Sequence, residues 1–333
     1  MKESHSLELA SRSEISIWTE TVLFAIINVL VFFGNLLTCY IVYRNHRLRT
    51  IPNMFVIALA VSDILISICC MPFTVVTLFY GQWIFGETFC RVNGFEVFTF
   101  AVASIYCMGV IAISRYFCVV KPERYLVLFR KEKISFYIAF AWLAALVGSV
   151  PPIFFEKGGF EFKPGKGMCL YTFESDIGYT LFVGFVCITA PLTLITISYV
   201  MVFRAVSRSN RVFSEESDFP RLRANIEEAK VSKTLVAVLV GFVSCWMPIY
   251  VIDTTDALRG NNAFPREVYI SYAFLLYLSS TINPVIYGVM NKELRREYKD
   301  IFSKILRCQH HNIIETETNP EVRFTARLEG RST

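Results

Sequence analysis

The segment TVLFAIINVLVFFGNLLTCYIVY, which spans residues 21–43, contains no charged side chain. An α-helix rises about 1.5 Å per residue, so roughly 20 apolar residues cross a hydrocarbon layer about 30 Å thick. Six more apolar runs of comparable length follow, at residues 51–80, 92–114, 134–155, 177–203, 234–252 and 268–291. The sequence therefore predicts a protein that crosses a membrane seven times.

The composition of the 333-residue chain supports this interpretation, with 54% hydrophobic and only 18% charged residues. Lipid offers no hydrogen bonds, so each crossing must satisfy its own backbone, and a helix does that within one segment. We expect an all-α membrane protein, a seven-transmembrane helix bundle that leaves no room for a second globular domain.

Basic residues are unevenly divided between the two sets of polar segments that alternate along the chain. The set that starts with the N-terminal tail carries 8 Lys and Arg, and the other set carries 22. Basic loops near helix ends stay on the cytoplasmic side of a membrane. The bias predicts an extracellular N-terminus and a cytoplasmic C-terminus. Nucleic-acid binding is disfavoured because the charge is spread over separate juxtamembrane loops.

Four regions are expected along the chain: an extracellular tail at 1–20, the bundle at 21–291, an amphipathic helix at 292–307 and a cytoplasmic tail at 308–333. The expected helices of the bundle span about 21–43, 51–80, 92–118, 134–155, 177–204, 228–253 and 268–291. Within 292–307, apolar side chains recur at helical spacing between basic ones, which is typical of a helix lying on the inner leaflet. Cys308 at its end is a candidate for palmitoylation, and the alternative is a free thiol.

Two cysteines fall on the predicted outer side, where disulfides form and persist. Cys90 precedes the third helix, and Cys169 lies within the loop before the fifth. A bridge between them would fasten that loop over the mouth of the bundle.

Polar and kinked positions inside the membrane are the first candidates for function. Asn35, Asp63 and Asn283 are strongly polar groups within apolar runs, and Pro248 and Pro284 each remove a helical hydrogen bond. A kinked helix can swing one half against the other, as a switching bundle requires.

With these residues in order, the chain resembles a rhodopsin-like (class A) G-protein-coupled receptor from Thr21 to Cys308. The residues that carry the resemblance follow one another helix by helix: Asn35, Asp63, Ser114-Arg115-Tyr116, Trp142, Pro191, Trp246 with Pro248, and Asn283-Pro284 with Tyr287. The resemblance implies a plasma-membrane receptor that couples an extracellular ligand to a heterotrimeric G protein, with arrestin and a receptor kinase as further partners.

The resemblance also implies a set of oxygen ligands for a sodium ion: Asp63, Ser104, Ser279, Ser280 and Asn283. One carboxylate among neutral oxygens suits a hard cation, and the alternative is a water-filled hydrogen-bond network. Pro191, Ile105 and Phe242 match the packing switch beneath the ligand, with Trp246 just above it.

The family's signalling residues begin with Arg115, whose release opens the cleft for the G protein when helix six moves away. The implied restraint is Glu228 on helix six, although Glu228 could equally be a solvated charge at a helix end. The family places an acidic residue before this arginine, whereas this chain has Ser114. We therefore expect appreciable signalling without ligand. Tyr199 and Tyr287 match two tyrosines that meet across the activated bundle.

The ligand pocket implied by the resemblance excludes two ligand classes. Receptors for biogenic amines carry Asp where Val97 stands, and visual pigments hold retinal on a lysine where Tyr277 stands. The chain is therefore neither aminergic nor an opsin, and no covalent cofactor is expected. The pocket residues matched by position are Val97, Phe98, Ala101, Val183, Cys187, Trp246, Tyr250, Asp253, Ala273 and Tyr277.

Local sequence is similar to melatonin receptors and related orphan receptors, notably at Gly81-Gln82-Trp83 and Ile286-Tyr287-Gly288. The histidine of melatonin receptors in helix five is replaced by Cys187, and their Asn-Ala in helix seven by Asn283-Pro284, which puts melatonin itself in doubt. A small non-aminergic ligand is favoured. A neuropeptide is the alternative, because Asp253 and the charged outer loops could bind basic side chains.

Other classes of protein fit less well. An enzyme is disfavoured because no nucleophile, base and orienting group converge, and no phosphate loop or metal-ligand spacing is present. A seven-helix transporter would be expected to carry paired halves or broken helices at matching positions.

Overall fold

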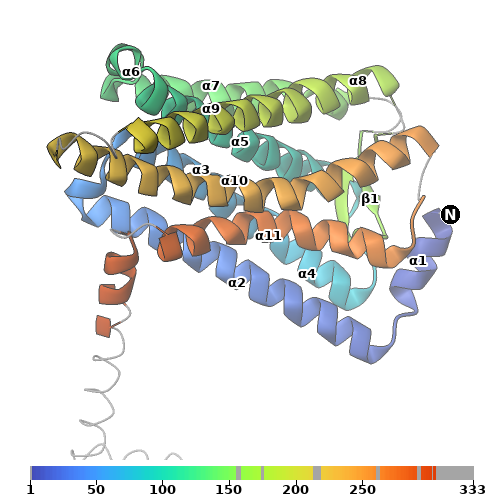
Figure 1. Ribbon diagram of the computed structural model, residues 1–333. Coiled ribbons are helices and arrows are strands. Elements are labelled where there is room, and N and C mark those ends of the chain that lie inside the picture. The colour runs from blue at the N-terminus through green and yellow to red at the C-terminus, as the bar shows by residue number, and fades with distance from the viewer. Residues whose placement is uncertain are drawn as a thin grey trace, which may run out of the picture.

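The computed structural model describes residues 2–154, 159–173, 176–212, 219–259, 263–290, 294–301 and 303–304, with only the backbone for 206, 209–212, 219–236 and 238–239. Long helices run alongside one another, and a two-stranded hairpin lies among them at one end of the bundle (Figure 1). We call this end the hairpin end, and the opposite end, where Arg115 lies near the close of the long helix α5, the Arg115 end.

Six helical spans among the described residues are long and apolar enough to cross a membrane. The helix α10 runs alongside them, and the all-α membrane fold predicted from the sequence is confirmed (Figure 1). The elements are α1 Lys2–Ala10, α2 Glu14–Arg44, η1 His46–Leu48, α3 Ile51–Cys69, α4 Met71–Tyr80, α5 Glu87–Val120, α6 Pro122–Leu128, α7 Lys131–Ser149, η2 Pro151–Phe154, β1 Phe160–Lys163, β2 Met168–Tyr171, α8 Ile177–Phe182, η3 Val183–Thr189, α9 Ala190–Val212, α10 Phe219–Arg259 and α11 Arg266–Met290.

The second span, expected as one helix over 51–80, is divided at Cys70 into α3 and α4. Pro72 lies in the first turn of α4, where its missing N–H is tolerated, but within a continuous helix its ring would clash with the carbonyl four residues back. The change of direction brings Thr74 and Leu78 of α4 into contact with α11 and the hairpin turn, respectively.

The fifth span contains a wide π-helical turn, η3, between α8 and α9. Pro191 has no N–H to donate to a regular helix. The amide of Ala190 just before it bonds the carbonyl of Phe185, five residues back. Wide turns of this kind are rare and occur frequently at functional sites.

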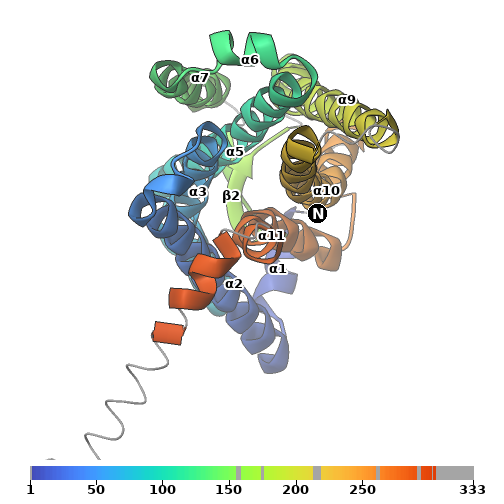
Figure 2. The same ribbon diagram turned by 60° about the vertical axis from the view of Figure 1, so that its left-hand side comes forward.

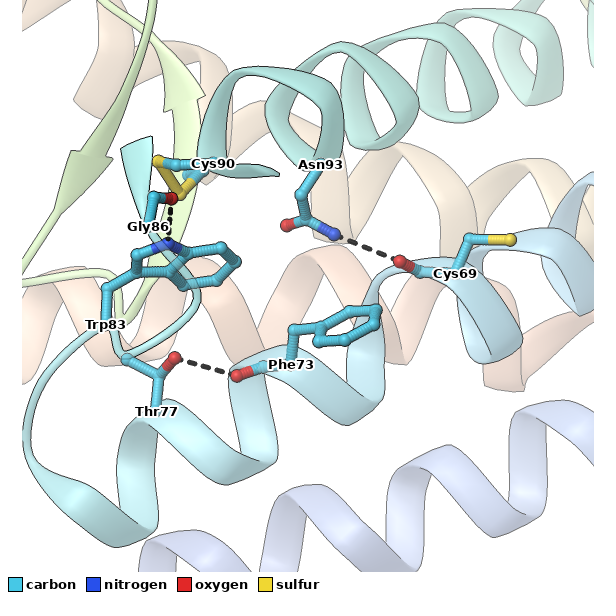
Figure 3. Close-up of a disulfide and its surroundings, with 8 residues drawn as sticks. Cys69, Phe73, Thr77, Trp83, Gly86, Cys90 and Asn93 are labelled. Carbon is cyan, nitrogen blue, oxygen red and sulfur yellow. Dashed lines mark hydrogen bonds between the residues drawn. A yellow bond between two sulfur atoms is a disulfide. The ribbon is translucent and has the colours of Figure 1, made fainter. Parts of the chain in front are cut away.

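The hairpin pairs β1 with β2 antiparallel, from Phe160 opposite Tyr171 to Lys163 opposite Met168. Figure 2 shows β2 inside the ring formed by α3, α5, α10 and α11. The disulfide Cys90–Cys169, predicted from the sequence, ties β2 to the first turn of α5. Figure 3 shows the indole of Trp83 close to this bridge, donating to the carbonyl of Gly86 at 2.8 Å. The hairpin is therefore held inside the bundle mouth.

The N-terminal residues, expected only as a polar tail over 1–20, form the helix α1 and the first turns of α2. The helix α1 lies across the hairpin end (Figure 1). Its Leu9 is buried, and the Leu9 carbonyl lies so close to Gly81 that a Cβ there would approach it to 3.0 Å. Gly81 also has φ of +70°, so both the contact and the backbone favour glycine.

The segment after α11 is helical over 294–301 and lies against α2. Leu294 is buried, and the Tyr298 hydroxyl is 2.7 Å from the Thr38 hydroxyl of α2. Asn45 donates to Glu297 at 2.9 Å. Cys308 and the rest of 305–333 lie outside the described residues.

Candidate ligand and signalling sites

The residues expected to line a ligand pocket come together at the hairpin end and are all buried or half-buried. Val183, Cys187, Ala273 and Tyr277 have no exposed surface at all. Tyr277 donates to or accepts from the Thr74 hydroxyl at 2.8 Å, which joins α11 to α4. The expected pocket is therefore largely filled by the protein itself.

Two cavities open beside these residues. One, of about 350 Å³, lies where α8 and η3 meet α10 and includes Tyr250 and Asp253 among its mostly apolar walls. The other, of about 920 Å³, is a groove between α1, the start of α5 and the hairpin, with Trp83 and Phe160 in its walls. Both volumes are large enough for a small ligand.

A buried ion pair joins the hairpin turn to α10. The Lys166 ammonium donates to Asp253 Oδ1 at 2.8 Å, and the side chains are only 8% and 9% exposed. The Tyr272 hydroxyl donates to Asp253 Oδ2 at 3.0 Å. Asp253 was predicted as a pocket residue, but its partner Lys166, 87 residues earlier in the chain, was not predicted. The glycine on each side of Lys166 allows the turn to approach the helices closely, but it does not indicate which residue Lys166 pairs with.

A second ionic cluster lies at the same end and was not predicted. Arg266 donates to both oxygens of Glu20, at 2.8 and 2.5 Å, and Arg12 donates to Glu20 Oε2 at 2.5 Å. Arg12 also donates to the Leu78 carbonyl of α4. Burial lowers the pKa of the Arg12 guanidinium, and the neighbouring carboxylate of Glu20 opposes that shift. The cluster ties α1, α2 and α11 together.

The polar residues expected at mid-membrane converge between α2, α3, α5 and α11. Asn283 donates to Asp63 Oδ2 at 3.0 Å, and Ser280 is buried close to the same carboxylate. Asn35 donates to the Ser280 carbonyl at 3.2 Å. Ser104 is buried on the neighbouring α5, whereas Ser279 donates its hydroxyl to the Leu276 carbonyl.

The packing-switch residues lie in the bundle core, beneath the residues expected to line the ligand pocket. Phe242 and Trp246 stack on α10 with ring centroids 5.4 Å apart. Ile105, Pro191 and Phe242 are all buried. Ile105, Phe242 and Trp246 belong to the buried apolar cluster of the bundle, to which α9 contributes Ile195 and Tyr199.

Toward the Arg115 end, Ser114, Tyr199 and Tyr287 are buried. No hydrogen-bond partner lies within reach of their hydroxyls, or of Arg115 Nε, among the described residues. Glu228 lies on α10, but its side chain is outside the described part of the structure. The predicted contact between Glu228 and Arg115 therefore lies outside it too. Pro248 lies inside α10 and Pro284 inside α11.

Comparison with known proteins gives matches over most of the chain. A sequence profile described as 7 transmembrane receptor (rhodopsin family) matches residues 34–287. Melatonin receptor type 1B of Rattus norvegicus is 29% identical over 285 residues, 84% of this chain and 77% of that receptor. G-protein coupled receptor 161 of Mus musculus is 29% identical over 324 residues, 89% of this chain and 59% of that receptor. The crystal structure of squid rhodopsin superposes with a TM-score of 0.75 and 24% identity, covering 91% and 90% of the two chains, which shows a shared fold.

Proposed function

Because the chain belongs to the rhodopsin family of seven-transmembrane receptors, it is a G-protein-coupled receptor and not an enzyme, and we propose that it signals by a swing of α10 away from Arg115. Its partners are an extracellular ligand and a heterotrimeric G protein. The hairpin end with α1 faces outward and the Arg115 end faces the cytoplasm, as the distribution of Lys and Arg favours. Arrestin and a receptor kinase act on the cytoplasmic side.

The observation that carries this proposal is a series of buried polar atoms without hydrogen-bond partners among the described residues. Each such atom costs about 1–3 kcal/mol unless it is paired by water or by a second arrangement of the helices. A bundle whose buried polar groups lack partners in one arrangement can gain hydrogen bonds in a second arrangement of its helices, and can therefore exchange between the two. The atoms are Trp246 Nε1, Ser104 Oγ, Asn283 Oδ1, Tyr287 OH, Tyr199 OH, Ser114 Oγ and Arg115 Nε.

The restraint on Arg115 is unusually weak, since the residue before it is Ser114 and carries no charge. Glu228 on α10 supplies the remaining carboxylate. When the contact between Glu228 and Arg115 is lost, Arg115 is freed and the population shifts toward the signalling arrangement. The receptor therefore signals without added ligand.

Replacing Glu228 with alanine raises ligand-free signalling above that of the wild type, because the last carboxylate restraint on Arg115 is gone. The measurement is nucleotide exchange on purified G proteins of several subtypes, with receptor in lipid nanodiscs. Glu227→Ala, which removes the adjacent charge, is the matched control. The proposal is wrong if wild-type receptor catalyses no more exchange than empty nanodiscs with every subtype, or if both variants match the wild type.

The cluster at Asp63 fits a sodium ion. Asn283 Oδ1 and Ser104 Oγ are buried oxygens without partners among the described residues, and Asn283 also donates to the Asp63 carboxylate. Such oxygens suit a hard cation. Asp63, Ser104, Ser279, Ser280 and Asn283 would hold the ion, which would neutralise the buried carboxylate. The protein's own contribution is to keep α3 and α11 joined through Asn283 and Asp63.

Sodium chloride is expected to raise the thermal unfolding midpoint of the purified receptor relative to N-methylglucamine chloride at equal ionic strength. A ligand that binds only the folded state stabilises it by mass action. Asp63→Asn keeps the shape of the side chain and removes its charge, so the sodium effect should disappear in that variant. Equal midpoints for the wild type in the two salts would exclude the ion and leave a water network.

The ligand is a small non-aminergic molecule that enters the cavity beside Tyr250 and Asp253. Support comes from its size, about 350 Å³, and from its mostly apolar walls. A neuropeptide is the alternative, favoured by the larger groove of about 920 Å³ under α1. A panel of indoleamines, lipids and small peptides, read through the same exchange assay, separates the two. Tyr250→Ala should weaken a ligand of the first cavity and leave a ligand of the groove unaffected.

A further inference from the structure

The turn between β1 and β2 is inserted tightly among the helices. A Cβ on Gly165 would come within 2.9 Å of the Tyr269 ring of α11. Gly167 has φ of +66°, and a Cβ there would come within 3.0 Å of Leu78 on α4. The turn therefore fits between α4 and α11 only because both positions lack side chains, and Lys166 between them is directed into the protein.

The Lys166 ammonium lies in a site built from one carboxylate and two aromatic rings. Its nitrogen is 2.8 Å from Asp253 Oδ1, 3.8 Å from the centroid of the Tyr272 ring and 5.6 Å from that of Tyr269. Tyr272 also donates to the second oxygen of Asp253, and Tyr269 donates to Asp256 at 2.5 Å. Both rings are thus fixed by hydrogen bonds while their faces remain available to the cation. Aromatic faces around a desolvated carboxylate form a strong site for an ammonium group.

We infer that Asp253, Tyr272 and Tyr269 form an ammonium-binding site of the receptor and that Lys166 is its tethered ligand, which sustains signalling without a diffusible one. This inference rests on the proposed swing of α10. It also explains why a diffusible ligand needs no amine, since the chain supplies the cation itself.

The direction of the effect follows from where the contact lies on α10. Asp253 is on the arm of α10 between Pro248 and the hairpin end, whereas the opposite arm leads toward Arg115. The disulfide Cys90–Cys169 fixes the hairpin to α5, so the ion pair draws the outer arm of α10 inward. If α10 pivots as a lever near Pro248, inward movement of the arm that carries Asp253 is accompanied by outward movement of the arm near Arg115. Occupation of the site by Lys166 therefore favours the signalling arrangement.

The test removes the tethered ammonium and returns it as a free molecule. Lys166→Ala should lower ligand-free nucleotide exchange about fivefold or more, the lower bound of typical coupling between two sites. The alanine leaves space for three carbons and a nitrogen, so millimolar n-propylammonium chloride should restore exchange, whereas n-propanol should not. Lys166→Arg keeps the charge and should retain more signalling than Lys166→Ala. Arg259→Ala, which removes an exposed basic side chain near the same end of α10, should match the wild type.

A measurement independent of G protein guards against a variant that merely folds poorly. The thermal unfolding midpoint of purified Lys166→Ala should rise with n-propylammonium and not with n-propanol. Adding Asp253→Asn to this variant should abolish the rise. No rise in Lys166→Ala overturns the ammonium site. Unchanged or increased exchange in Lys166→Ala overturns the tethered ligand as an activator. If the wild type activates no G protein, the proposed function fails, while the midpoint still tests the site.

Discussion

Replacing Glu20 with glutamine lowers the stability of the receptor by about 3–5 kcal/mol, the usual cost of removing one partner from a buried ion network. Glu20 pairs with both Arg12 and Arg266, whose side chains are only 4% and 10% exposed. Without its charge the two guanidinium groups face each other, and both remain away from water. The loss corresponds to a fall of roughly 10 °C in the thermal unfolding midpoint for a chain of this size class.

The matched control for this change is Glu87→Gln. Glu87 pairs with Arg91 one helical turn away at 2.7 Å, but its side chain is 80% exposed. Exposed pairs of this kind contribute about 0.5 kcal/mol or less, so the control should unfold within about 1–2 °C of the wild type. Equal midpoints for Glu20→Gln and Glu87→Gln would show that the cluster does not hold α1, α2 and α11 together.

Exchanging Cys90 and Cys169 together for serine is expected to detach the hairpin from α5 and to abolish most ligand-free signalling. The bridge spans 79 residues, and closing such a loop is worth about 4.5 kcal/mol in a chain that unfolds completely. The membrane helices α5 and α7 lie within the loop and restrict its unfolded state, so the stability loss should be smaller. The larger effect falls on Lys166, because the bridge helps the close contacts of Gly165 and Gly167 to keep the hairpin opposite Asp253.

The double serine variant is measured by unfolding midpoint and by nucleotide exchange, beside Cys39→Ser, which removes a half-buried free thiol. The control should behave as the wild type in both measurements. Full ligand-free exchange in the double variant would show that the hairpin stays in position without the bridge. It would also contradict the part assigned to the disulfide in holding Lys166.

The bundle could be predicted from the sequence because each span is long enough to cross lipid by itself. A disulfide between Cys90 and Cys169 could be predicted because topology places both on one side. The helix break at Cys70 was missed, although Pro72 was a visible signal for it. The end of α7 at Ser149 is explained in the same way by Pro151 and Pro152, and not by loss of apolar character.

The ion pair of Lys166 with Asp253 could not be predicted, since it depends on how far the hairpin enters the bundle. That depth is set by tertiary contacts, namely the close approach of Gly165 to Tyr269 and of Gly167 to Leu78. The Glu20 cluster is similar, because it joins Arg12 before the first span to Arg266 at the start of the last. Pairings between distant segments leave no periodic trace in a single sequence.

The wide turn of η3 has a consequence for any alignment with other receptors. A bond that closes over five residues instead of four adds one residue to the turn, which rotates everything beyond it by about 100° around the helix axis. A relative with a regular helix there would present a different side chain inward at the same aligned column. A contact made by a residue aligned with Val183 or Cys187 can therefore be assigned to this chain only if the other receptor has the same extra residue in its backbone at this turn.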